Sequence, residues 1–187
     1  MKTEIEILSD RELEIWDYAK SQNGTMDFVT EKLFAEGIFE QYRNIHKSYL
    51  ALYFRIDDET AKLEILKRMM FLNWYALVEP SCYTGIEDLD EVSVFESYFI
   101  LNQYLIHGKI DTEFKWMLSF YSSWDHTILP FSENKLEALT AFVNRVDTSI
   151  RSYPKNQLPK GTMENRGQMG IYWISMSVEK KKLTNNF

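Results

Sequence analysis

The run Met69–Val78 constrains the fold of this chain more than any other segment. Nine of its ten residues are apolar or aromatic, and Asn73 is the single interruption. A helix on the surface needs a polar face, so a helix that is apolar all round has to be buried. We therefore expect this run to lie at the centre of the fold. The helix should end at Glu79, because Pro80 disfavours helical backbone in the residue before it.

Helical patterns also dominate the remainder of residues 1–152. Ser9 and Glu12 have the spacing of a capping box, in which each side chain bonds the backbone amide of the other residue. Thr25 caps a second, longer stretch, which is either one helix or two helices that meet at Gly37. Acidic or hydroxyl residues mark the starts of further helices, at Asp57–Glu59, at Asp88 or Asp90, at Asp111 and at Ser132.

A second apolar helix is expected at Val92–Ile106, and it should pack against Met69–Val78. In the helical turns before Met69, Lys67 is predicted to face outward while Leu66 and Met70 face the core. The expected helix starts near residues 90, 111 and 132 recur every 21 residues, and two such steps have the length of a HEAT-like repeat. The sequence therefore predicts an all-α fold, an irregular bundle of about six helices, with HEAT-like stacked hairpins as the alternative.

The C-terminal part differs in composition from residues 1–152, which we expect to form the helical domain. Residues 153–187 begin with a stretch rich in proline, glycine and polar residues, which is typical of loops. Residues 171–178 alternate between two faces, as a strand does, and Glu4–Ile7 alternates as well. The extension should pack on the same domain. It adds either a short strand, in a small sheet with the N-terminus, or one more helix.

The charge of the chain narrows the range of partners. The formal net charge is −7. It is the sum of a charge of +4 on residues 153–187 and a charge of −11 on residues 1–152. Such an acidic body argues against nucleic acids and anionic membranes as partners. Cys82 is the only cysteine, and no window of 18 residues is apolar and uncharged. Since the N-terminus is also too acidic for a secretory signal, we expect a cytoplasmic protein that does not cross a membrane.

The histidines do not have the spacing of a metal site. Helical bundles bind metals through pairs such as Glu-x-x-His, one helical turn apart. None of His46, His107 and His126 has an acidic residue three positions before it or a histidine four positions after it. We therefore expect no metal and no other cofactor. The alternative is a metal site that His46 and His126 build across two helices.

A candidate pocket is suggested by a few polar or reactive residues beside the two apolar helices. In one interpretation a buried carboxylate in this pocket acts as a general acid or base. In the other the asparagines bond each other or a kinked backbone, the glutamate after Val78 caps its helix or points outward, and the cysteine of the expected loop 81–89 is a half-buried thiol. The candidate residues are Asn73, Trp74, Glu79, Cys82, Glu96 and Asn102.

No motif for catalysis rises above background, so no catalytic residue is assigned. The acidic charge and the aromatic content favour a non-enzymatic protein-binding or regulatory module with an unidentified protein partner. One concrete form is an acidic immunity-type inhibitor that neutralises a cationic toxin. The alternative is a small-molecule-binding or metal-dependent helical-bundle enzyme with its pocket near the central helices.

Overall fold

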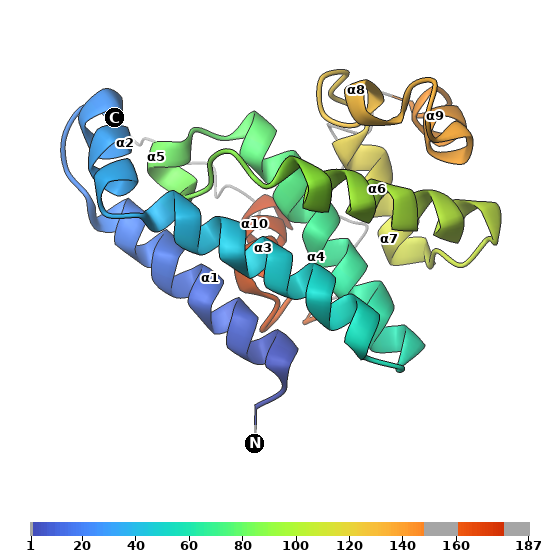
Figure 1. Cartoon of the computed structure of the whole chain (residues 1–187), viewed down its shortest axis with the longest axis horizontal. Helices are drawn as coiled ribbons and strands as arrows, with labels where there is room; N and C mark the ends of the chain where they lie inside the picture. Colours follow the sequence, from blue (N-terminus) through green and yellow to red (C-terminus); the bar gives the residue numbers. More distant parts are fainter. Residues whose placement is uncertain (1, 148–160, 178–187) are drawn as a thin grey trace, which may run out of the picture.

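A computed structural model describes residues 2–147 and 161–177 of the chain (Figure 1). All regular structure in these two ranges is α-helical, which confirms the predicted all-α bundle. None of these helices combines the length and the apolarity that crossing a bilayer requires. The helices are α1 (Glu4–Ser21), α2 (Met26–Ala35), α3 (Ile38–Arg55), α4 (Glu59–Val78), α5 (Ser81–Thr84), α6 (Glu91–Ile106), α7 (Thr112–Tyr121), α8 (Leu129–Ser132), α9 (Glu137–Val143) and α10 (Gly167–Ser177).

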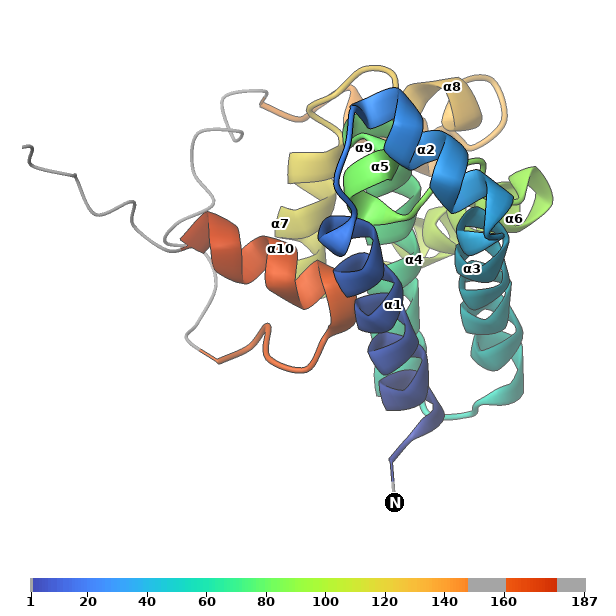
Figure 2. The same cartoon turned by 90° about the vertical axis from the view of Figure 1, so that its left-hand side faces the viewer.

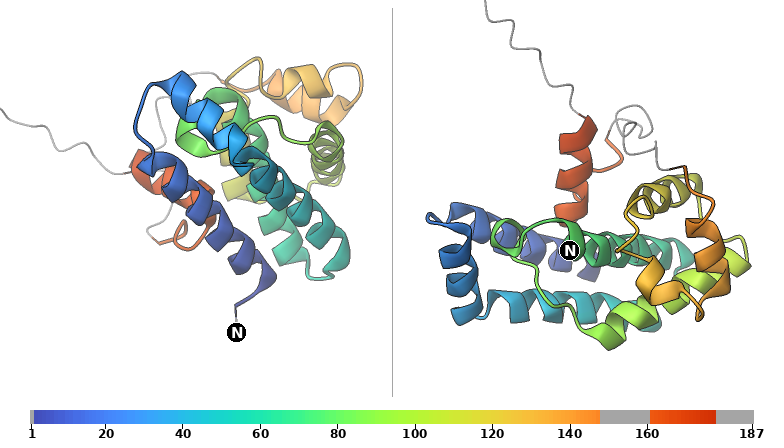
Figure 3. Two further views of the ribbon diagram at one scale, coloured as in Figure 1. Left: turned by 60° about the vertical axis from the view of Figure 1, so that its left-hand side comes forward. Right: turned by 90° about the horizontal axis from the view of Figure 1, so that it is seen from above.

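The helices form three layers around α4. Figures 2 and 3 show α1 and α4 in the middle, α3 and α6 on one side, and α7 and α10 on the other. The shorter helices lie at the two ends. At one end α5 packs against α1, and α2 packs against α3 and α5; at the other end α8 and α9 pack against α6. Because α4 has neighbours on both sides, it cannot have a polar face of ordinary width.

The burial of α4 agrees with its central position but is shifted from the expected segment. Ten consecutive residues, Ile65–Trp74, are buried, whereas Leu77 near the end of the apolar run is exposed. Lys67 was predicted to face outward, and this prediction is wrong. Its ammonium group is covered by the start of α7, where it lies 2.6 Å from Asp111 and 2.7 Å from Glu113. A covered cation keeps its charge when carboxylates replace the lost water.

Of the strand and the helix that the sequence left open for residues 171–178, the structure has the helix over the described part, because residues 171–177 belong to α10. The same is true of Glu4–Ile7, which opens α1. The buried apolar side chains of α10 are Met169 and Trp173, one helical turn apart. Trp173 packs on the aromatic rings of α7 and donates a hydrogen bond of 3.2 Å to the Tyr121 hydroxyl. The packing of Trp173 on the aromatic rings of α7 thus favours a helix, although the sequence of this segment alternates as a strand does.

The first helix begins six residues earlier than the capping box at Ser9 predicted. Thr3 is the cap: its hydroxyl accepts a hydrogen bond from the Glu6 backbone amide (3.2 Å), and the Glu6 carboxylate accepts one from the Thr3 amide (2.6 Å). Ser9 lies inside the helix, where its hydroxyl donates to the Ile5 carbonyl. Two successive sequences, residues 3–6 and 9–12, fit the same motif here, and the first of them forms the cap.

The other predicted caps are largely confirmed. Thr25, Asp58, Asp90 and Asp111 each accept a hydrogen bond from a backbone amide in the first turn of the helix that follows. Gly37 separates two helices and has a positive φ of 71°, a backbone conformation that costs glycine little. The expected loop after Pro80 starts with the short helix α5 instead.

The regular spacing behind the HEAT-like alternative fails at its third helix start. Ser132 ends α8 rather than capping a helix, and α9 begins at Glu137. Pro130 sits in the first turn of α8, where its missing amide costs nothing. The expected sixth helix is shorter than predicted, because α9 ends at Val143. The last residues of that expected helix, the boundary between residues 152 and 153, and the stretches 153–160 and 178–187 lie outside the described residues.

A buried carboxylate joins the layers. Glu12 of α1 accepts hydrogen bonds from the Tyr49 hydroxyl of α3 and from the Gln168 backbone amide of α10, the latter at 3.0 Å. Burial raises the pKa of Glu12, and the positive charge of Arg68 opposes this shift. Arg68 of α4 donates to the same Tyr49 hydroxyl (3.2 Å) and to Ser9. The middle layer is thereby bonded to the helices on both of its sides.

Replacing Glu12 by glutamine should destabilise the fold. A glutamine side chain has one acceptor oxygen, so either the Tyr49 hydroxyl or the Gln168 amide loses its acceptor. We expect the free energy of unfolding to fall by about 1–3 kcal/mol, measured by urea denaturation. Glu14→Gln, at an exposed position of the same helix, is the control and should stay within about 0.5 kcal/mol of the wild type. Equal effects of the two substitutions would contradict the role of Glu12.

Candidate binding pocket

A pocket of about 640 Å³ opens between α4, the segment that leads into α6, α6 itself and the region of α8. This volume is within the usual range for ligand pockets. Its walls are mostly apolar and its polar residues are mostly acidic, and we refer to it as the acidic pocket. The lining residues are Asn73, Ala76, Leu77, Glu87, Asp88, Leu89, Glu91, Val94, Phe95, Pro130, Phe131 and Lys135.

The charge of the acidic pocket is unbalanced. Glu87, Asp88 and Glu91 supply three carboxylates, and none of them forms a salt bridge within the described residues. Lys135 is the one cation among the lining residues, and its ammonium group lies 5.6 Å from the centre of the Phe95 ring. The negative potential at the mouth of the pocket is therefore only partly compensated.

Residues 87–91, which supply the three carboxylates of the pocket, are held in place at both ends of the segment. Ile86 before it is fully buried, and its backbone amide donates a hydrogen bond of 3.1 Å to the Thr84 hydroxyl. Asp90 caps α6 through Ser93 and lies 3.2 Å from the Lys47 ammonium group. The hydrogen bonds from Ser93 and the contact with Lys47 lower the pKa of Asp90 to about 2. The carboxylates of the pocket thus project from a fixed backbone.

Asn73 belongs both to the lining of the pocket and to a buried polar group behind it. Its amide nitrogen donates to the Ser97 hydroxyl (2.9 Å), and that hydroxyl donates to the Val94 carbonyl (2.7 Å), which determines the orientation of the amide. Asn73 Oδ1 is buried and has no hydrogen-bond partner among the described residues. The polar interruption of the apolar run is thus used to connect α4 to α6.

His46 of α3 is part of the same buried polar group. The residue is fully buried, and neither ring nitrogen has a hydrogen-bond partner in the described part of the chain. Burial lowers the pKa of His46 to about 4, and the Asn73 side chain and the charge of Asp90 oppose the shift. The imidazole is therefore neutral at neutral pH. The sequence contained a signal for this burial, since His46 shares a helical face with Tyr42 and Tyr49.

The other predicted site residues lie outside the acidic pocket. Trp74 packs on the opposite side of α4 against the rings of Phe120, Tyr121 and Trp124. Cys82 is buried in α5. Glu79 is the half-buried residue that ends α4, and Glu96 is a half-buried residue of α6. Of the six candidates, Asn73 is the one that lines this pocket.

Asn102 has a structural role. Its side-chain oxygen accepts a hydrogen bond of 3.0 Å from the Leu139 backbone amide, in the first turn of α9. Since Leu136 at the start of that helix offers no side-chain cap, Asn102 replaces the cap from a neighbouring helix. The suggestion that Asn73 and Asn102 bond each other is wrong, because each has another partner.

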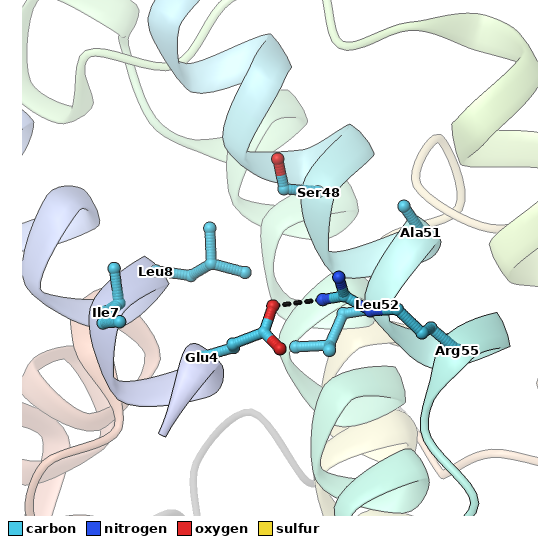
Figure 4. Close-up of a pocket in the computed structure, with 7 residues that line it drawn as sticks. All are labelled: Glu4, Ile7, Leu8, Ser48, Ala51, Leu52 and Arg55. Carbon is cyan, nitrogen blue, oxygen red and sulfur yellow. Dashed lines mark hydrogen bonds and ion pairs between the residues drawn. The ribbon is translucent and has the colours of Figure 1, made fainter. Parts of the chain in front are cut away.

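A second pocket, of about 400 Å³, lies between α1 and α3 (Figure 4). Leu8 and Leu52 lie between the two helices, and an ion pair between Glu4 and Arg55 crosses from one to the other. Both charges in this pocket are therefore already paired with each other. Its lining has no uncompensated charge and gives a ligand less to recognise than the acidic pocket does.

Two further results bear on function. Within the described residues, no three His, Cys, Asp or Glu side chains are placed to hold a metal ion together. Comparison with protein-family models, with curated proteins and with solved structures finds no match to this chain. The all-α bundle is thus the class that the fold defines, and function has to be argued from the pocket alone.

The burial of His46 should make stability depend on pH. An exposed histidine titrates near pH 6.5, and the pKa of His46 is lowered to about 4. Between these values the unfolded chain binds a proton that the folded chain does not, so the free energy of unfolding should fall as the pH drops. Relative to His46→Gln, the wild type should lose ~3 kcal/mol between pH 6.5 and 4, measured by urea denaturation.

A matched control separates this effect from general acid destabilisation. His126→Gln, at an exposed position, should retain the wild-type loss of stability. If His46→Gln and the wild type lose stability in parallel over this range, His46 is not buried in its neutral form.

Proposed function

We propose that this chain is a non-enzymatic binding module whose acidic pocket receives a cationic, partly apolar segment of a protein partner. The observation that carries the proposal is the composition of the pocket. Apolar walls from Leu77, Val94 and Phe131 lie beside carboxylates that have no salt-bridge partner among the described residues. Apolar contact supplies affinity in such a site, and charge selects the partner and speeds its approach.

The chemistry of the lining supports binding rather than catalysis. The residues that line the acidic pocket include no serine, cysteine or histidine, so the pairing of a serine or cysteine nucleophile with a histidine base is absent from this lining. His46 lies behind Asn73 and is neutral, and Cys82 is buried in α5. An acidic inhibitor of a cationic toxin is one form of this proposal, because such a toxin would present basic residues around an apolar anchor.

Two short peptides of opposite charge provide the test. Blocked Lys-Phe-Lys and blocked Glu-Phe-Glu have the same length and the same aromatic anchor, and each is titrated into labelled protein while amide chemical shifts are recorded. We expect Lys-Phe-Lys to shift the amides of residues 87–91, Phe131 and Lys135, and the effect should weaken with salt because exposed charges are screened. Glu-Phe-Glu should leave these amides unchanged.

Charge-removing variants sharpen the test. The double variant Glu87→Gln, Asp88→Asn should bind Lys-Phe-Lys roughly tenfold more weakly, because two charge contacts with the peptide are lost. Asparagine is suited to position 88, where φ is +46°. Asp17→Asn, at an exposed position of α1, is the control and should bind as the wild type does. Equal shifts with both peptides, or shifts elsewhere, would contradict the proposal.

A further inference from the structure

The outer face of α6 carries a row of exposed apolar side chains, which we refer to as the α6 stripe. It consists of Val92, Phe95, Phe99 and Ile106, with exposed fractions of 77%, 37%, 43% and 57%. The opposite face of the helix is buried against α3, α4 and α9. In Figures 2 and 3, α6 lies at the edge of the molecule, and none of the described helices covers its outer side.

The spacing of the α6 stripe is that of a helix–helix contact. Val92, Phe99 and Ile106 are each seven residues apart, and Phe95 adds the position three residues after the first. Apolar residues at this spacing form the seam along which two helices pack. Exposed apolar side chains that are continuous in this way mark an interaction surface, whereas isolated ones need no explanation. The α6 stripe is therefore the face on which a second helix would pack.

The charges at the two ends of α6 indicate which helix this is. Acidic residues surround the start of α6, namely Glu87, Asp88 and Glu91. The basic residue Lys109 lies just beyond its end, after His107. Two copies of α6 in antiparallel orientation would place the acidic end of each beside the basic end of the other. In parallel orientation, acidic ends would meet and repel each other.

We propose that a second copy of this chain packs on the α6 stripe, with the two α6 helices antiparallel. Val92 and Ile106 of the stripe are equally far from Phe99, whereas Phe95 of each chain would lie level with Gln103 of the other. In the dimer Phe99 meets its own copy at the two-fold axis, and Val92 of each chain lies level with Ile106 of the other. The same surface thus serves on both subunits, as a closed two-fold interface requires. Phe95 and the carboxylates at the start of α6 also line the acidic pocket. The dimer requires only a second copy of this chain, so this inference does not rest on the proposed function.

The first experiment measures the oligomeric state. Sedimentation equilibrium of the full chain from about 5 to about 500 µM covers the affinities expected for a small interface. The wild type should pass from monomer to dimer over this range, and Phe99→Glu should raise the dissociation constant by at least about tenfold, because it places two carboxylates at the axis. Phe34→Glu is the control: Phe34 is a more exposed phenylalanine, on α2, and its variant should dimerise as the wild type does.

The second experiment measures the orientation through disulfide formation under mild oxidation. The native Cys82 is buried, so an introduced thiol is the one that reacts. Phe99→Cys should form a covalent dimer, and a mixture of Val92→Cys and Ile106→Cys proteins should form the mixed dimer. Val92→Cys alone should not cross-link efficiently, and neither should Phe34→Cys. A wild type that stays monomeric at the highest concentration, or efficient cross-linking of Val92→Cys to itself, would overturn the proposal.

Charge reversal provides an independent check. Lys109→Glu should weaken the dimer, and adding Glu91→Lys to the same chain should restore it, because the opposite charges then meet again with their positions exchanged. A double variant that is no more dimeric than the single variant would show that these ends do not meet.

Discussion

The fold depends on how it pairs a carboxylate that it buries completely. A buried charge is costly unless hydrogen bonds replace the water it loses, and Glu12 obtains them from two other helices. Gly167 makes the second of these contacts possible, because its φ is positive and a Cβ atom at this position would clash with the Glu12 carboxylate. Arg166 next to it binds both Glu64 of α4 and Glu113 of α7. The start of α10 is thus held by charge as well as by aromatic packing.

The position of α4 between two layers determines which apolar residues reach the surface. The buried half of α4 is fully used by its neighbours, so the apolar run meets solvent near its end, where Leu77 and Ala76 line the acidic pocket. Asn73 ties that end of α4 to α6 through Ser97. The inner face of α6 is therefore buried in the core. Its outer face carries the stripe proposed as a dimer contact, and Phe95 borders both the stripe and the pocket.

Much of the helical architecture was predictable because its signals are local. Caps such as Asp58 and Asp111 act within four residues of their own helix, and Gly37 and Pro80 interrupt helices through their own backbone geometry. The predicted site was harder, because polar residues near an apolar run have several possible partners. Asn73 does line a pocket, whereas Asn102 caps a distant helix and Trp74 faces the aromatic cluster on the opposite side of α4.

The sequence by itself determined that this chain is an all-α bundle with α4 at its centre, since apolar periodicity and capping depend on neighbours along the chain. Only the tertiary structure decided that Lys67 and Arg68 are buried, that residues 171–177 are helical, and that α4 and the region of α8 form a pocket beside the acidic residues 87–91. Each of these outcomes depends on partners far away in the sequence, such as Glu113 for Lys67 and Tyr121 for Trp173. A pattern read along the chain contains no information about which distant group will replace the water around a charge or cover a ring.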